Sequence, residues 1–326
     1  MEQKNMNKHF KNHLLKTTRP IGFLWVSILF CFYILFSNSA SGKTEMEYKY
    51  LLSFNTHKSL CLVRINGMTA MDNLNSSNGT QSRGINSTAF LENGANSIEL
   101  LFGSRSFEEE LKSESRCEAT LKKVSIYNED GEIISQIKLV VDKDGNAVTE
   151  ESRRNISDKK ASYDSTGMSK IPAEEGLFSA KKTYTINGLP DWMWAKAQPV
   201  TEKHLPMIKT FYQEIINTFS QKDLDKIWKM SQPAWEEWAI ADNSNPKIFF
   251  NSMEFEEKID SDKYTVRTEP EWKKFRLVSY KNGRLFRLEA GAHGRSPILF
   301  DNKETGKTAT YSPYLSIING KVVIAR

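Results

Sequence analysis

The chain has 326 residues, with 45 Lys and Arg against 40 Asp and Glu, so its formal net charge is +5 at neutral pH. Five of those basic residues and one of the acids lie within residues 1–42, which leaves 40 basic and 39 acidic residues for the rest of the chain. A net charge near zero gives no support to nucleic-acid binding through a strongly basic surface, because such binding depends on clustered positive charge.

The first 42 residues have the order of a secretory signal. Basic residues come first, a run of sixteen uncharged residues follows over 21–36, and small residues occupy 37–42, with cleavage expected after Gly42. An uncleaved anchor stays open, since sixteen residues fall only somewhat short of the ~20 that a spanning helix needs. Either way we expect the bulk of the chain in the periplasm or the extracellular medium. The inner membrane would be contacted only through an uncleaved signal.

The cysteine content predicts one disulfide. Signal cleavage would remove Cys31 and leave Cys61 and Cys117, an even pair in an oxidising compartment. The bond would close a loop of roughly 55 residues, and chain-entropy arguments give it ~4 kcal/mol of stabilisation. Two unpaired, buried thiols are the alternative.

The mature chain is long enough for two domains, and its first block, residues 43–142, predicts an all-β domain. Short β-prone runs occupy 48–54, 59–65, 92–103 and 117–142. Turn signals stand at Asn66-Gly67, Asn93-Gly94 and Asp130-Gly131. Alternating apolar residues from 133 to 141 indicate one buried face. A polar segment rich in Ser and Asn runs from Asp72 to Ser87.

Part of this block is similar to a known kind of sandwich. A strand ending in RING (64–67), a long loop and then LENGANSIEL (91–100) resemble the jelly-roll or galactose-binding-like β-sandwiches that accompany many bacterial sugar-active enzymes. The resemblance rests on the turn residues and covers about forty residues. It implies a β-sandwich for residues 43–142. It also allows a carbohydrate-binding module, although fold alone does not imply function.

Residues 143–198 are predicted to be a polar linker and inter-domain segment. From Asp142 to Lys182 the chain is rich in Ser, Asp, Lys and Glu and has scarcely any apolar periodicity. Trp192 and Trp194 follow, beside prolines. Because tryptophans dominate cores and interfaces alike, we expect this pair at an interface, either between the two domains or with an external partner.

Residues 199–326 predict an α+β domain in which helices precede an antiparallel sheet. Apolar residues recur at three- and four-residue spacing over 207–219, and Asp223 and Ser231 are each predicted to cap a further helix. The β-prone runs begin at Phe249. This order is similar to the cone-shaped domains of the nuclear-transport-factor-two superfamily, which implies a curved sheet around a pocket and indicates no ligand.

The candidate site residues outside the tryptophan pair lie in this second block. His293 and Arg295 stand in the Gly-rich loop EAGAHGRSP (289–297), whose glycines would leave both side chains unobstructed. A plain connection between two strands is the alternative. Arg287 and Glu289 share one face of the preceding strand, where they would pair either in a pocket lining or as an ordinary ion pair.

Sequence motifs give no support to a metal, a cofactor or a catalytic nucleophile. Asp142 and Asp144 begin like a calcium loop, but Ala147 and Arg153 stand where that loop needs Gly and Glu. The chain has no paired Cys-x-x-Cys or H-E-x-x-H motif for zinc and no G-x-S-x-G elbow. We therefore expect no cofactor and no metal.

These observations favour a non-enzymatic binding protein of the bacterial envelope. It would hold a protein partner through the sandwich loops, the domain junction or both. An immunity or inhibitor protein against a periplasmic toxin is one specific form of this hypothesis. A hydrolase of envelope polymers or small molecules, with its site near His293, is the first alternative. A carbohydrate-binding module is the second.

Overall fold

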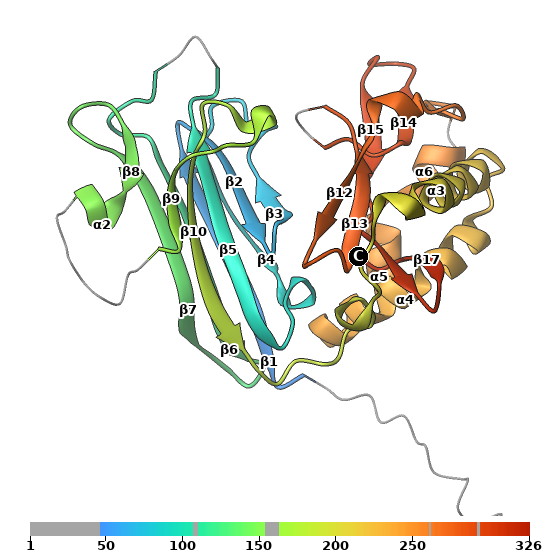
Figure 1. Ribbon diagram of the computed structural model, residues 1–326, viewed down its shortest axis with the longest axis horizontal. Coiled ribbons are helices and arrows are strands. Elements are labelled where there is room, and N and C mark those ends of the chain that lie inside the picture. Colours follow the sequence, from blue (N-terminus) through green and yellow to red (C-terminus); the bar gives the residue numbers. More distant parts are fainter. Residues whose placement is uncertain (1–45, 107–109, 154–162, 261, 292–293) are drawn as a thin grey trace, which may run out of the picture. The chain divides into compact units, whose positions relative to one another are not determined.

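The computed structural model describes residues 46–106, 110–153, 163–260, 262–291 and 294–326. Its architecture is mostly β with an α+β C-terminal part (Figure 1). The expected signal segment lies outside the described residues. Among the residues that the structure describes, no helix is long and apolar enough to cross a membrane. Residues Thr44–Arg326 form one compact unit, and the division of this unit into two domains stays a prediction.

Two five-stranded antiparallel sheets form the predicted β-sandwich (Figure 1). The first sheet has the order β4-β1-β6-β7-β8, with β1 (Tyr48–His57), β4 (Gln81–Asn86), β6 (Arg116–Ser125), β7 (Asn128–Val141) and β8 (Ala147–Thr149). The second has the order β3-β2-β5-β10-β9, with β2 (Leu60–Ile65), β3 (Met68–Asp72), β5 (Gly94–Gly103), β9 (Ser165–Met168) and β10 (Phe178–Ile186).

The inner faces of both sheets supply the core of the sandwich. Along β2, buried residues alternate with half-buried ones, so Cys61, Val63 and Ile65 point inward. This period of two is the signal that predicted the strand. Other fully buried members of this core are Leu52, Phe54, Ile98, Leu100, Phe102, Ala119, Leu121, Ile137 and Leu139.

Residues 143–198, expected to be a polar linker, contribute three strands to these sheets. β8 extends the first sheet, and β10 and β9 extend the second. β10 pairs with β5 along its whole length. The sequence hides β10 because Lys182 occupies an inward position between Ala180 and Tyr184, where its ammonium group donates to the Gln136 carbonyl at 2.8 Å. A charge at an inward position breaks the alternation by which a strand is recognised.

A disulfide joins the two sheets, as predicted. It links Cys61 in β2 to Cys117 in β6, with the two Cα atoms 6.3 Å apart and a sequence separation of 56. Both side chains are buried in the core of the sandwich. A closed loop of this length corresponds to ~4 kcal/mol of stabilisation in the chain-entropy model.

The C-terminal part has helices followed by antiparallel strands, as predicted, but the strands begin at Tyr264 and not at Phe249, because residues 246–260 form two short helices. The helices are α3 (Leu205–Ser220), α4 (Leu224–Asp242), α5 (Pro246–Ser252) and α6 (Phe255–Asp260), while the short α2 (Glu150–Arg153) follows β8. One sheet has the order β11-β14-β15, with β11 (Tyr264–Val266), β14 (Ile298–Asn302) and β15 (Thr308–Tyr311). The other has the order β12-β13-β16-β17, with β12 (Arg276–Tyr280), β13 (Leu285–Glu289), β16 (Leu315–Ile318) and β17 (Lys321–Ile324).

The apolar stripe of α3 packs on these strands. Ile208, Tyr212, Ile215, Ile216 and Phe219 are all buried. The Phe219 ring lies at the centre, with its centroid 5.0 Å from that of Phe255 and 5.1 Å from that of Phe300. Spacing of three and four residues puts one face of a helix against its support, so the stripe explains the orientation of α3.

The two predicted helix caps have different outcomes. Asp223 caps α4, because its carboxylate accepts a hydrogen bond from the Lys226 backbone N–H at 2.9 Å. Ser231 does not cap a helix, since α4 runs through it. Its hydroxyl donates to the Ile227 carbonyl at 2.7 Å and accepts from the Trp235 indole N–H at 2.8 Å. Those internal bonds suit a buried serine inside a continuous helix.

Candidate functional site

We call residues Asn73–Thr80, which join β3 to β4, the anchored loop. Asn73 and Gly79 are buried, whereas Asn75, Ser77 and Asn78 are exposed. The loop therefore combines fixed attachment points with hydrogen-bonding groups that face solvent. Binding loops on rigid scaffolds have this arrangement.

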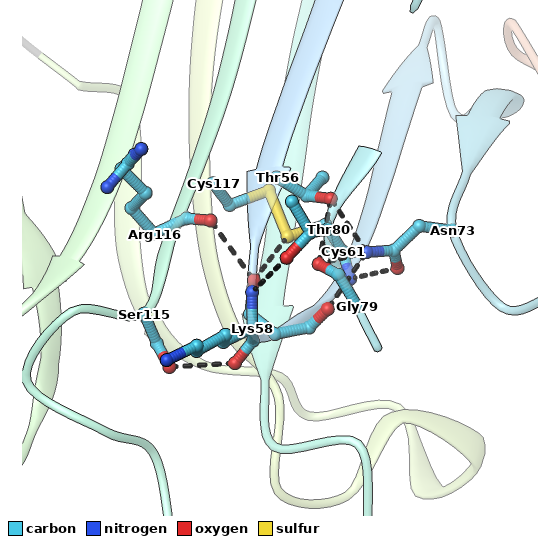
Figure 2. Close-up of a disulfide and its surroundings, with 10 residues drawn as sticks. Thr56, Lys58, Cys61, Asn73, Gly79, Thr80, Ser115, Arg116 and Cys117 are labelled. Carbon is cyan, nitrogen blue, oxygen red and sulfur yellow. Dashed lines mark hydrogen bonds between the residues drawn. A yellow bond between two sulfur atoms is a disulfide. The ribbon is translucent and has the colours of Figure 1, made fainter. Parts of the chain in front are cut away.

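Asn73 holds the loop from inside (Figure 2). Its side-chain oxygen accepts from the Cys61 backbone N–H at 2.8 Å, and its own backbone N–H donates to the Cys61 carbonyl at 3.2 Å. Its side-chain nitrogen donates to Thr56 Oγ1 at 3.0 Å, to the Ser59 carbonyl at 2.8 Å and to the Gly79 carbonyl at 3.2 Å. The amide of Asn73 is thus fully used in positioning the loop.

The turn between β1 and β2 links the anchored loop to the region of the disulfide (Figure 2). The Lys58 backbone N–H donates to Thr80 Oγ1 at 3.2 Å, and the Lys58 carbonyl accepts from Ser115 Oγ at 2.7 Å. Ser59 Oγ donates to the Arg116 carbonyl at 3.0 Å. The turn therefore contacts the loop on one side and the start of β6 on the other.

Two further features fix the outer half of the loop. Arg105 donates to the Ser76 carbonyl at 2.7 Å, and Asn78 Oδ1 accepts from the Thr80 backbone N–H at 2.9 Å. Gly79 has a φ of +68°, and a Cβ atom there would lie 2.6 Å from the Ser59 carbonyl oxygen. Only glycine combines that backbone conformation with so close an approach.

The anchored loop borders a hollow of about 310 Å³. Amide and hydroxyl groups line it together with one acid, Asp72, and one base, Arg83. The side-chain oxygen of Gln81 is buried and has no hydrogen-bond partner within the described part of the chain.

Trp192 and Trp194 make internal contacts. Both are almost completely buried. The indole N–H of Trp192 donates to the Leu91 carbonyl at 2.7 Å. The Arg326 guanidinium lies 5.3 Å from the Trp192 ring centroid and 5.8 Å from that of Trp194. The pair therefore packs the segment before β5 against the end of the chain.

Arg287 and Glu289 are brought together on β13, with Nε and Oε1 2.6 Å apart and side chains 12% and 8% exposed. The Tyr280 hydroxyl also donates to Glu289. Burial is the largest influence on Tyr280 and raises the pKa of its hydroxyl, while Arg287 opposes this rise. Burial would lower the pKa of Arg287, but Tyr314, Tyr280 and Glu289 outweigh it and raise that pKa. The guanidinium therefore stays charged.

The loop that follows β13 passes over this pair. Gly294 has a φ of +59°, and a Cβ atom there would lie 3.1 Å from Glu289 Cδ and 3.2 Å from Arg287 Nη2. Arg295 closes the loop by exchanging two backbone hydrogen bonds of 2.9 Å with Ala290, and its side chain is exposed. His293 lies outside the described residues.

A second hollow, of about 360 Å³, lies between the sandwich and the turn from β12 to β13. Beside it, Glu92 binds Lys281 at 2.5 Å and both terminal nitrogens of Arg284 at 2.7 Å. Burial would raise the pKa of Glu92, but the hydrogen bonds from Arg284 and Lys281 outweigh burial and hold that pKa below its usual value. One carboxylate therefore binds two cations and ties the two parts of the unit together.

The sequence indicated only part of this geometry. The Ser- and Asn-rich segment after Asp72 was recognisable as a polar excursion, and Asn78-Gly79 is a turn signal. The inward position of Asn73 has no sequence signature. Across the ranges that the structure describes, no group of three or more His, Cys, Asp and Glu side chains could hold a metal ion.

Comparison of the chain with protein-family models, with characterised proteins and with solved structures found no match. The resemblances to sugar-associated sandwiches and to cone-shaped domains therefore remain expectations. What can be said of function rests on the contacts of the chain's own residues.

Proposed function

We propose that this chain is an exported, non-enzymatic binding protein that holds a protein partner of the envelope through the anchored loop. The observation that supports the proposal is that the loop has a buried, fully bonded attachment residue and exposed polar residues. Asn73 is buried and fully bonded, whereas Asn75, Ser77 and Asn78 are exposed. A loop ordered before binding loses little conformational entropy when a partner arrives. Ser, Asn and Gly supply adaptable hydrogen bonding in other binding loops.

The hollow beside the loop supports a polypeptide as the partner. Exposed amides and hydroxyls offer both donors and acceptors, which suits a peptide backbone and polar side chains. An inhibitor of a toxin delivered to the same compartment is a specific form of this proposal, since inhibitors typically bind through preformed surfaces.

An affinity experiment tests the proposal. Oxidised protein spanning residues Thr44–Arg326 is used to capture partners from envelope extract, with quantification by mass spectrometry. We expect one stoichiometric protein partner, and at least tenfold less of it with a triple variant, Asn75→Ala, Ser77→Ala and Asn78→Ala. A matched control, Lys303→Ala with Glu304→Ala, changes exposed residues elsewhere and should capture as much as the wild type. Equal capture by the triple variant would exclude the loop.

A hydrolase with its site beside Arg287 and Glu289 is the second candidate function. The specific observation in its favour is the close approach of Gly294, the residue after His293 in sequence, to a buried carboxylate. A carboxylate can orient an imidazole that acts as a general base. Hydrolysis of envelope polymers by the wild type, lost in a His293→Ala variant of unchanged thermal stability, is the expected result. Undiminished activity in that variant would exclude His293.

A further inference from the structure

We propose that formation of the Cys61–Cys117 disulfide fixes the conformation of the anchored loop, so that the protein becomes competent to bind only after oxidation. This inference rests on the proposed function, because it describes the regulation of the same loop. Its structural basis is a short chain of contacts from the disulfide to Asn73, Gly79 and Thr80 of the loop (Figure 2).

The first step of that chain is the double hydrogen bond between Cys61 and Asn73. The Cys61 backbone donates to the Asn73 side chain and accepts from the Asn73 backbone. The disulfide fixes Cys61 relative to β6, so it also fixes the attachment point of the loop. Asn73 then transmits this position to Gly79 through its side-chain nitrogen.

The second step runs through the turn between β1 and β2. Lys58 contacts Thr80 on the loop side and Ser115 on the β6 side. Ser59 reaches across the same gap to Arg116, which precedes Cys117. The turn leads directly into β2 and is bonded to the start of β6, so its contacts lie beside both strands that the disulfide joins.

Packing makes the spacing between these two strands sensitive to oxidation. Both cysteine side chains lie in the closed core of the sandwich. Two separate thiols need more room than a bonded pair, because non-bonded heavy atoms lie ~3.5–4 Å apart whereas bonded sulfurs lie ~2 Å apart. Close-packed interiors have little space to spare. The reduced form must therefore move Cys61 away from β6, which disturbs the contacts of Lys58, Ser59 and Asn73.

The chemistry is a two-electron oxidation. Each thiol loses one hydrogen and the two sulfurs bond, while two electrons and two protons pass to the oxidant. A thiol–disulfide oxidoreductase of the exported compartment serves as that oxidant, and its own disulfide is reduced to two thiols. Once the core has closed, burial protects the bond from attack by external thiols. Oxidation is therefore effectively irreversible: the loop lacks its fixed conformation before export and has it after export.

The first experiment uses hydrogen exchange read by mass spectrometry to compare the oxidised wild type with the reduced wild type, which keeps both thiols, and with a Cys61→Ala, Cys117→Ala double variant. We expect the amides of residues 73–80 to exchange at least ~tenfold faster in the reduced wild type, and by a larger factor than the amides of α3. Equal acceleration of the loop and α3, or none in the loop, would overturn the proposal. No binding partner is needed, so this result is independent of whether the proposed function holds.

A second experiment keeps the disulfide and so does not depend on folding of the double variant. Coupling between two sites is reciprocal, so a loosened loop must expose the bond. We expect Asn73→Ala to raise the rate of disulfide reduction by dithiothreitol under native conditions at least ~tenfold. Asn75→Ala is the matched control, because it changes an exposed asparagine of the same loop. Equal reduction rates in the two variants would refute the coupling.

Discussion

The ionic cluster around Glu92 predicts that replacing Arg284 destabilises the whole unit. Arg284 donates to both carboxylate oxygens of Glu92 at 2.7 Å and to the Ala195 carbonyl at 2.6 Å. The two side chains are 20% and 11% exposed. An Arg284→Met variant keeps an unbranched apolar stem and loses the charge and every hydrogen bond. Glu92 then retains Lys281, at 2.5 Å, as its cationic partner.

The loss of stability in Arg284→Met depends on the partner that Glu92 keeps. Removing one partner of a buried ion pair costs ~3–5 kcal/mol when the other charge is left uncompensated. Lys281 still neutralises Glu92, so the upper part of that range does not apply. A hydrogen bond to a charged group contributes ~1.5–3 kcal/mol, and we expect a loss of about 2–3 kcal/mol in the free energy of unfolding. With roughly 2 °C per kcal/mol for a unit of this size, the midpoint should fall by about 4–6 °C.

Urea denaturation of the oxidised protein, followed by tryptophan fluorescence, measures this change directly. The control is Lys196→Met, whose partner Asp191 lies 2.6 Å away in a pair that is 72% and 65% exposed. Exposed pairs contribute little, so the control should lose no more than ~0.5 kcal/mol. Equal losses in the two variants, or a loss below ~1 kcal/mol for Arg284→Met, would refute the argument that burial makes this cluster stabilising.

Three further predictions follow from the same contacts. Folding lowers the pKa of Glu92 from its ordinary value of 4.5, so its charged form stabilises the protein above pH 4.5, and this stabilisation is lost as the pH falls through the lower folded pKa. In a plot of unfolding free energy against pH, Glu92→Gln should therefore show a smaller decrease at acid pH than the wild type. Trp192→Phe removes the 2.7 Å bond to the Leu91 carbonyl and should cost ~1–3 kcal/mol in urea denaturation. Gly294→Ala, with a close neighbour at its Cβ position, should lower the thermal midpoint more than Gly145→Ala, which has positive φ and open space.

The sandwich could be predicted where its strands bury one apolar face. β2 alternates cleanly and was expected. β10 was not expected, because Lys182 stands at an inward position, where the fold provides the Gln136 carbonyl and the Glu151 carboxylate as partners for its ammonium group. Local periodicity reports burial, so it fails where a long polar side chain lies in an inward position with its charged end bonded.

The sequence predicted the candidate site only where it depends on the number of cysteines or on the alternation of residues along one strand. Two cysteines in an oxidising compartment predicted the disulfide, and alternation on a strand put Arg287 and Glu289 on one face. The anchored loop depends instead on register. β2 and β3 pair with a shift between Val63 and Arg64, and this irregularity helps to determine which residue at the end of β3 meets Cys61. Sequence patterns do not specify such a shift.

The register of β2 also separates the two features on which the proposals rest. Leu60 pairs with Gly103 at the end near the disulfide, and Ile65 pairs with Ile98 at the end near Glu92. The four residue steps from Cys61 to Ile65 span ~13 Å of strand. Perturbations that far apart, without shared partners, usually act independently. The ionic cluster should therefore affect stability without altering the anchored loop, whereas Asn73 should affect the loop without altering the cluster. A binding scaffold requires a rigid connection at one end and a preorganised surface at the other. The binding loop then becomes ordered during folding and not during association.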